Sequence, residues 1–277
     1  MMIRKVYLIV NPKKDPDGMY HERVCTLLGE KGIEFIEPDG SSDTSAIDPD
    51  AAYGCDAIFT VGGDGTLIQA ARELSDIDKP FFPINIGTLG YMTETTMETA
   101  SSALDRLLSG QYRIQERMRL HAFLPAGEEM TALNDVVIAR TGEMHILDFN
   151  LWINGKLVHT YSADGIIIAT PTGSTGYNLS AGGAIVDPQS QMIVVTPICP
   201  HTIRPTSLVV SGDDELTIEV LDNIEQGTNV AISVDGGRML QLAGDDKVKV
   251  CRSYRKTALI RFDDDSFLDA LFKKMKD

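Results

Sequence analysis

The sequence predicts an α/β N-terminal domain with a Rossmann-like, mostly parallel sheet, followed by an antiparallel β-sandwich-like C-terminal domain. In roughly the first 110 residues, short apolar runs alternate with amphipathic helical stretches, the pattern of strands connected by helices. After residue 112, short strand-like runs follow one another, separated by Gly, Pro, Asn and Asp. That spacing is typical of an antiparallel sandwich.

The N-terminal elements follow from their apolar patterns. Buried strands are expected at residues 6–10, 34–36, 57–61 and 81–86. Helices are expected where apolar residues recur at helical spacing, at residues 19–30, 66–75 and 97–108. Gly32 and Gly110 follow the first and the last of these helices, as is common after a helix C-terminus.

The C-terminal elements are short and strand-like. They are expected at residues 133–140, 149–153, 166–170, 192–195, 208–210, 216–220, 230–234, 247–250 and 259–262. A short amphipathic helix is expected at residues 266–276. We therefore expect an α/β domain at residues 1–112, a β-rich domain at 113–256, and a segment at 257–277 that packs back on the first domain.

The net charge of the chain argues against a nucleic-acid-binding protein. The 277 residues include 43% apolar and 23% charged residues, and the net charge is −15. Nucleic-acid surfaces need clustered Lys and Arg, so we expect no nucleic-acid partner. The net negative charge repels a phosphorylated ligand, so hydrogen-bond donors close to the ligand must hold it.

The sequence also predicts a cytoplasmic protein with no membrane partner. No apolar run approaches the roughly 18 residues of a bilayer span, and residues 1–5 lead into a strand without a signal-peptide cleavage site. Cys25, Cys55, Cys199 and Cys251 form no C-x-x-C pair, so we expect four buried or semi-buried free thiols.

The strongest functional signal is Gly-Gly-Asp-Gly-Thr at residues 62–66, between a buried strand and a helix. Its glycines let backbone N–H groups approach a bulky anion, and the helix N-terminus favours phosphate. A carboxylate repels phosphate, so Asp64 either takes a proton, holds a metal or caps the helix. No Gly-Lys-Ser/Thr follows, so this is not a P-loop.

Two further segments carry polar groups suited to a nucleoside. Residues 164–183 run from a buried strand into a loop rich in Gly, Ser and Thr, where hydroxyl groups can bond a ribose or adenine and Tyr177 offers a stacking face. Asn134 and Asp135 stand at the start of an apolar strand. An amide beside a carboxylate suits a sugar diol, although such a pair is also common in turns.

Taken together, these segments resemble the NAD kinase family. The resemblance covers nearly the whole chain, through residues 62–66, Asn-Ile-Gly-Thr-Leu-Gly-Tyr at 85–91, Asn134-Asp135 and residues 164–183. Gly-Gly-Asp-Gly-Thr also occurs in diacylglycerol and sphingosine kinases, whereas residues 164–183 indicate the NAD kinases. The resemblance implies an enzyme that phosphorylates the 2′-hydroxyl of the adenosine ribose of NAD, using ATP and Mg²⁺ or another divalent cation, to give NADP.

The resemblance also implies roles for individual residues. Asp64 corresponds to the general base, and Gly62, Gly63 and Gly65 to the phosphate path. The residues expected to bind NAD are Asn134, Asp135, His145, Ser162, Asp164, Thr172, Thr175, Gly176, Tyr177, Asn178, Leu179 and Ser180. Asp164 corresponds to the residue that reads the nicotinamide carboxamide. Many members carry Glu in place of Asp135, and some carry Arg in place of Ser162. The protein ligands of the metal are not indicated.

Family resemblance further implies a homodimer or homotetramer. Two alternatives stay open at this point: a lipid or sphingoid-base kinase with the same glycine turn, and a non-catalytic NAD(P)-sensing module. The first should show an apolar groove or a basic membrane-facing patch, which a chain of net charge −15 disfavours. The second should have lost Asp64 or its glycines, and both are present.

Overall fold

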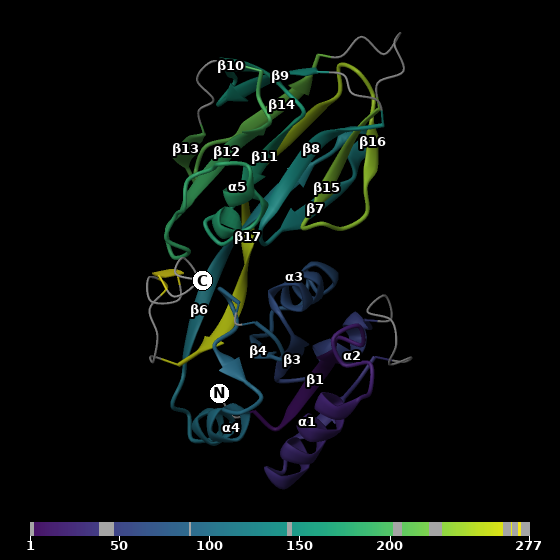
Figure 1. Cartoon of the computed structure of the whole chain (residues 1–277), viewed down its shortest axis with the longest axis vertical. Helices are drawn as coiled ribbons and strands as arrows, with labels where there is room; N and C mark the ends of the chain where they lie inside the picture. The colour runs from purple at the N-terminus through teal and green to yellow at the C-terminus, as the bar shows by residue number, and fades with distance from the viewer. Residues whose placement is uncertain are drawn as a thin grey trace. The chain divides into compact units, whose positions relative to one another are not determined.

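The structure, a computed structural model, describes residues 3–38, 47–88, 90–142, 146–201, 207–221, 229–262, 267, 271 and 272. The chain divides into two compact units (Figure 1). Unit 1 consists of Met1–Glu116 together with Thr257–Asp277, and unit 2 is Arg117–Lys256.

Unit 1 is built on a parallel sheet, as predicted. Its strands, in the order β4-β3-β1-β2, are β4 (Phe81–Asn85), β3 (Ala57–Gly62), β1 (Lys5–Val10) and β2 (Glu34–Ile36). The short β5 (Thr95–Thr96) pairs with β4, also in parallel. Each of these strands is followed along the chain by a helix or a long connection, which is what parallel pairing requires.

Helices cover both faces of this sheet. They are α1 (Met19–Glu30), α2 (Pro49–Tyr53), α3 (Asp64–Glu73) and α4 (Ala100–Leu108). Val6 and Leu8 of β1 share one apolar cluster with residues of α1 and α4. Between them, Tyr7 points the other way, and its hydroxyl accepts a hydrogen bond from the Asp48 N–H at the start of α2, 2.8 Å away. The strand alternation therefore supplies a core on each side of the sheet.

Unit 2 contains two antiparallel sheets. One has the order β13-β12-β11-β8-β15-β16, formed by β13 (Leu208–Ser211), β12 (Met192–Ile198), β11 (Gly165–Ala169), β8 (Asp135–Thr141), β15 (Asn229–Val234) and β16 (Leu240–Leu242). The other contains β10 (Lys156–Ala163), β9 (Leu147–Ile153), β14 (Leu216–Val220), β17 (Lys247–Arg261), β6 (Arg113–Phe123) and β7 (Glu129–Ala132). Short helices α5 (Tyr177–Ser180), η2 (Pro125–Gly127) and η3 (Gly173–Thr175) lie in the connections.

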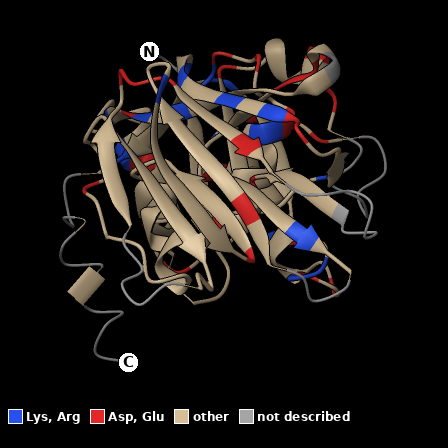
Figure 2. Cartoon of the chain, turned by 90° about the horizontal axis from the view of Figure 1, so that it is seen from above, with Lys and Arg blue, Asp and Glu red and all other residues tan. Residues whose placement is uncertain are grey.

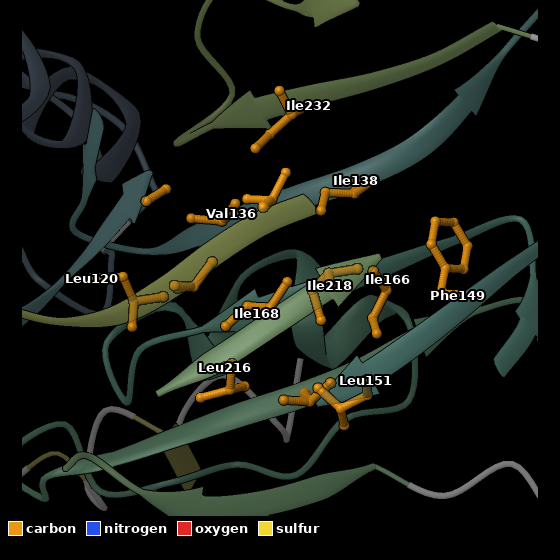
Figure 3. Close-up of a cluster of buried hydrophobic side chains, with 14 of the residues drawn as sticks. Leu120, Val136, Ile138, Phe149, Leu151, Ile166, Ile168, Leu216, Ile218 and Ile232 are labelled. Carbon is orange, nitrogen blue, oxygen red and sulfur yellow. The ribbon is translucent and has the colours of Figure 1, made fainter. Parts of the chain in front are cut away.

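Apolar side chains of both sheets meet in one core, which confirms the sandwich-like architecture. Figure 3 shows Val136, Ile138, Ile166, Ile168 and Ile232 of the first sheet facing residues of the second. The residues of the second sheet that Figure 3 labels are Leu120, Phe149, Leu151, Leu216 and Ile218.

Several element bounds differ from those expected. The helices predicted at 66–75 and 97–108 begin at Asp64 and Ala100 instead. The two strands predicted at 247–250 and 259–262 are one strand, β17, and the prediction of a break between them is wrong. The intervening residues are polar, but they include no Gly or Pro, and they stay extended because β17 also pairs with β6. The helix predicted at 266–276 falls largely outside the described residues, although 267, 271 and 272 are helical.

None of the helices in the described part of the chain is long and apolar enough to span a bilayer.

Removal of one aromatic ring from the core of unit 2 should lower the stability of the protein considerably. Phe149 is fully buried, so Phe149→Ala should lower the free energy of unfolding by about 3–5 kcal/mol. Trp152 is the single tryptophan of the chain and lies in β9, so its fluorescence during urea unfolding reports on this unit. Ile146→Ala, at a side chain that is 51% exposed, is the control and should change stability by less than about 0.5 kcal/mol. Equal effects of the two substitutions would contradict the assigned core.

Candidate active site

The glycine turn at residues 62–66 connects β3 to α3 in unit 1. The Thr66 hydroxyl anchors the turn, because its Oγ1 accepts hydrogen bonds from Asn11 Nδ2 at 2.9 Å and from the Gly63 N–H at 3.4 Å. Gly63 is the N-cap of α3, and Asp64 is the first residue of the helix. The interpretation of Asp64 as a helix cap is therefore wrong, and its carboxylate is used elsewhere.

The Asp64 carboxylate is held by a loop that follows β4. It accepts hydrogen bonds from the backbone N–H of Tyr91 at 2.6 Å and of Met92 at 3.2 Å. Gly90 makes this approach possible, since a Cβ at that position would lie 1.8 Å from Asp64 Oδ1. These contacts fix the direction of a partly buried carboxylate at the N-terminus of a helix.

Two side chains hold the loop itself. Asn85 Nδ2 donates to the Thr88 carbonyl at 2.9 Å and to Thr93 Oγ1 at 3.2 Å, and Asn85 Oδ1 accepts from the Gly87 N–H at 2.9 Å. Thr93 Oγ1 also accepts from the Gly90 N–H at 3.0 Å. Asn85 and Thr93 are buried, so the loop that orients Asp64 is tied to the end of β4.

Lys14 is a functional candidate that the sequence analysis missed. Its ammonium lies over the turn, because a Cβ at Gly63 would be 2.5 Å from Lys14 Nζ and one at Gly87 would be 3.9 Å away. Its position in the sequence, shortly after β1, could have indicated this. The strands β1 and β3 are parallel neighbours in which Val10 pairs with Val61. Loops that follow neighbouring parallel strands meet at one edge of the sheet, where ligands commonly bind.

In unit 2, a second carboxylate organises the predicted nucleoside-binding residues. Asp235 accepts hydrogen bonds from the backbone N–H of Leu133 at 2.6 Å, Asn134 at 2.7 Å and Asp135 at 3.0 Å. The sequence analysis also missed Asp235, although it stands in an Asp-Gly-Gly turn directly after a predicted strand. It adopts a positive φ of 51°, a conformation typical of turns.

Asn134 and Thr172 keep polar atoms that the protein does not use. Asn134 Oδ1 and Thr172 Oγ1 are buried and have no hydrogen-bond partner among the described residues. The two segments are in contact, because the Thr170 N–H donates to the Asn134 carbonyl at 2.8 Å, and a Cβ on Gly173 would lie 2.1 Å from that same oxygen. Buried polar atoms without partners are costly, so a bound ligand that donates to them would be stabilised.

Asp135 and Asp164 both lie close enough to Tyr177 for their charges to act on its hydroxyl group. Burial raises the pKa of the Tyr177 hydroxyl, and the charges of Cys199, Asp135 and Asp164 raise it further. Tyr177 is 47% exposed, so part of the residue remains open to solvent. Unit 2 thus brings three of the predicted site residues into one neighbourhood.

Asp164 is already paired within the protein. Its carboxylate accepts from Arg140 Nε at 2.9 Å and Arg140 Nη2 at 3.1 Å, a bidentate arrangement. The Arg140 guanidinium lowers the pKa of Asp164, with a smaller contribution from the charge of His201. Asp164 is therefore a fixed acceptor that has part of its hydrogen-bonding capacity left.

Asn178 is the predicted site residue that is most engaged inside the protein. Fully buried, it donates through Nδ2 to the Ser174 carbonyl at 2.9 Å and to the Ala184 carbonyl at 3.0 Å. Its Oδ1 accepts from Thr196 Oγ1 at 2.7 Å. These bonds hold the loop that precedes and follows α5, while its neighbour Leu179 is exposed.

The other predicted residues are spread over unit 2. Ser180 is exposed at the end of α5, and a Cβ on Gly176 would lie 3.4 Å from Asn134 Nδ2. Thr175 Oγ1 donates to the Thr172 carbonyl at 3.4 Å. Ser162 donates to Asp148 on β9. His145 lies outside the described residues.

Among the described residues, one group has the side chains to bind a metal ion through three ligands. It consists of His21, Cys25 and Glu37 in unit 1, whose ligand atoms lie within 4.8 Å of one another. A nitrogen, a sulfur and an oxygen do not form the all-oxygen set that Mg²⁺ prefers. This group is therefore distinct from any Mg²⁺ that accompanies a nucleotide.

The burial of the cysteines agrees only in part with the prediction from the sequence. All four cysteines are free, but Cys199 is exposed, which corrects the expectation of four buried or semi-buried thiols. Figure 2 shows that both Lys or Arg and Asp or Glu occur along the strands and connections in view.

Asp135 predicts a pH-dependent stability. Burial, with the charge of Asp235, raises the pKa of Asp135 from 3.8 to about 7, and this carboxyl group is only 6% exposed. Its contribution to stability is therefore fully present below about pH 4 and is lost as the pH rises through about 7, by roughly 2–4 kcal/mol.

Asp135→Asn removes this titration, so the variant should gain stability relative to wild type between pH 4.5 and pH 8. Urea unfolding followed by Trp152 fluorescence at both pH values measures the change. The same difference from wild type at both pH values would show that Asp135 ionises normally.

Comparison with known proteins identifies the family of the chain. The model of the ATP-NAD kinase N-terminal domain matches residues 6–112, and that of the ATP-NAD kinase C-terminal domain matches residues 133–262. The chain is 39% identical over 289 residues to the NAD kinase of Lachnospira eligens, covering 97% of this chain and 99% of that one. It is 38% identical over 274 residues to the NAD kinase of Agathobacter rectalis, covering 97% of each.

Two solved structures share the fold. A yeast NADH kinase complexed with NADH matches with a TM-score of 0.84 at 22% identity, over 98% of this chain and 86% of that one. An NAD kinase from Archaeoglobus fulgidus in complex with ATP matches with a TM-score of 0.82 at 22% identity, over 98% of each chain. With both domain models matched and full-length relatives well above 30% identity, the chain belongs to the ATP-NAD kinase family.

Proposed function

We propose that this protein transfers the γ-phosphoryl group of ATP to the 2′-hydroxyl of the adenosine ribose of NAD, giving NADP and ADP. The observation that carries the proposal is the Asp64 carboxylate, which two backbone N–H groups hold at the N-terminus of α3. Relatives that match nearly the whole chain are NAD kinases, which supports the same substrate here.

In this reaction Asp64 acts as the general base. A ribose hydroxyl is a poor nucleophile at neutral pH, and a carboxylate within hydrogen-bond reach can take its proton as the new O–P bond forms. The bond between the γ-phosphorus and the leaving oxygen of ADP breaks in the same transfer. The N–H groups of Tyr91 and Met92 hold the carboxylate in place, so that it need not reorganise during the reaction.

The donor phosphates would bind over the glycine turn. The first turn of α3 offers free backbone N–H groups and the positive end of the helix dipole, and Lys14 adds a full positive charge over Gly63. Mg²⁺ usually binds one or two carboxylates together with substrate phosphates. The turn offers Asp64 as its single carboxylate, so we infer that Mg²⁺ would be held mainly by the donor itself, where it would supply positive charge against the phosphates.

NAD would bind to the polar groups of unit 2. Asn134 Oδ1 and Thr172 Oγ1 are unpaired acceptors or donors for ribose hydroxyls, and the exposed ring of Tyr177 suits stacking. Asn178 would contribute by holding the loop. We assign the phosphate chemistry to residues 1–112, NAD binding to residues 113–256 and a packing role to 257–277.

The two alternatives receive less support. A lipid or sphingoid-base kinase would need a basic membrane-facing patch, which a net charge of −15 disfavours. A non-catalytic sensor would have no reason to keep Asp64 held by two N–H groups and faced by a glycine. We expect a cytoplasmic homodimer or homotetramer.

One assay tests the function. The purified protein is incubated with Mg·ATP and NAD, and separately with Mg·ATP and either diacylglycerol or sphingosine in detergent micelles. NADP and ADP should form in equal amounts only with NAD. Phosphorylation of a lipid without NADP would make the protein a lipid kinase, and no product in any tube would favour the sensor.

Asp64→Asn tests the general base. The amide keeps the size of the side chain but cannot take a proton, so kcat should fall about 10²–10⁴-fold while the KM for NAD changes much less. Gly90→Ala should lower kcat similarly, because the added methyl group displaces the Asp64 carboxylate. Steady-state kinetics on folded protein gives both values.

The control is Gly29→Ala, at an α1 position where a Cβ meets nothing within 4 Å. It should keep wild-type activity. Asp64→Asn activity within about threefold of wild type would remove Asp64 from the base role.

Lys14 provides a second kinetic test. Lys14→Met should reduce kcat/KM for ATP about 10–100-fold, the equivalent of losing one hydrogen bond to a charged group. Lys14→Arg should recover part of the loss. Lys13→Met is the matched control, because Lys13 is also exposed and bonds Asn11 through its backbone N–H. Equal rates for the two methionine variants would show that Lys14 does not contact the donor.

A further inference from the structure

Three side chains that the proposed reaction does not use meet at the start of α1 and the end of β2. His21 and Cys25 are four residues apart on α1, and such residues lie on the same face of a helix. Glu37 comes directly after β2. An imidazole nitrogen, a thiol sulfur and a carboxylate oxygen thus lie within 4.8 Å of one another, all partly buried.

One of the distances between these atoms matches a tetrahedral metal ion, and a second needs a small shift. His21 Nε2 lies 3.6 Å from Cys25 Sγ. Bonds of about 2.1 Å to nitrogen and 2.3 Å to sulfur, at a tetrahedral angle, require a spacing of about 3.6 Å. His21 Nε2 and Glu37 Oε1 are 2.6 Å apart, a hydrogen bond that has to open by about 0.8 Å to admit the ion. Glu37 keeps 31% of its side chain exposed, which leaves room for that shift.

The backbone that carries the first ligand is held in place. The buried Asp15 carboxylate accepts from the Tyr20 N–H at 3.1 Å and from the His21 N–H at 2.8 Å. This fixes the first turn of α1, and with it the helix face that presents His21 and Cys25. Ligands on rigid elements lose less conformational entropy when they bind a metal.

We propose that His21, Cys25 and Glu37 form a zinc-binding site, in which a water molecule completes four ligands. Zinc accepts nitrogen, sulfur and oxygen together, whereas Mg²⁺ and Ca²⁺ require oxygen. The site connects α1 to the end of β2 and is independent of phosphoryl transfer. It uses a single cysteine, which is why spacing rules based on cysteine pairs do not detect it.

Cobalt(II), a spectroscopic substitute for zinc, tests the site in the full-length protein. Titration of metal-free protein at pH 7.5 should give one equivalent bound, with the intense visible bands of a tetrahedral ion and a near-ultraviolet thiolate-to-cobalt charge-transfer band. One equivalent of Zn²⁺ should abolish the spectrum. Weak visible absorption without the charge-transfer band in the wild-type protein would overturn the proposal, whatever the variants do.

Variants identify the ligands. Cys25→Ser should lose the charge-transfer band, and His21→Gln should weaken cobalt binding at least about tenfold. Cys251→Ser, at another partly buried free thiol, is the control and should keep the full spectrum. Cys25→Ser and His21→Gln should still form NADP, which shows that they are folded. A band that persists in folded Cys25→Ser places the cobalt elsewhere and refutes the site.

Discussion

The hydrogen bonds from Tyr91 and Met92 to the Asp64 carboxylate decide what the glycine turn can do. Tyr91 and Met92 follow Asp64 by 27 and 28 residues in the sequence. With the Asp64 carboxylate bound there, the N-cap residue of α3 makes no side-chain capping bond. An anionic carboxylate would otherwise repel the phosphates that the turn attracts. Because the loop binds the carboxylate from one side, the same turn would, in the proposed reaction, offer N–H groups to phosphate and an oriented base to a hydroxyl.

In unit 2, another carboxylate likewise accepts hydrogen bonds from backbone N–H groups. Asp235 accepts hydrogen bonds from three consecutive N–H groups at the start of β8, and so fixes the backbone that carries the side chains of Asn134 and Asp135. In both units backbone N–H groups donate to an acidic side chain: in unit 1 they orient the Asp64 carboxylate, and in unit 2 the Asp235 carboxylate orients the backbone. In the proposed reaction a chain of net charge −15 binds anionic nucleotides, so its attraction for phosphate would depend on local N–H groups and on Lys14.

Much of the architecture could be predicted because local patterns determine it. The strands of unit 1 are short, apolar and separated by amphipathic helices, and their parallel pairing follows. The elements that were missed depend on distant partners. Residues 251–258 look like a loop, yet β6 keeps them extended within β17. Lys14 and Asp235 were missed for the same reason, since each acts on a segment at least about 50 residues away, at Gly63 and at Leu133 to Asp135.

The course of β17 constrains how the protein is made. Unit 1 contains Thr257–Asp277, and Ile260 and Phe262 belong to the same apolar cluster as β1, α1 and α4. A ribosome delivers these residues only after the whole of unit 2. The usual order, in which the N-terminal part of a chain completes its fold first, is therefore not open to this protein. During synthesis, part of the apolar face of the N-terminal sheet therefore stays uncovered until residues 257–277 emerge. Unit 2, which is inserted between the two parts of unit 1, can complete its fold before then.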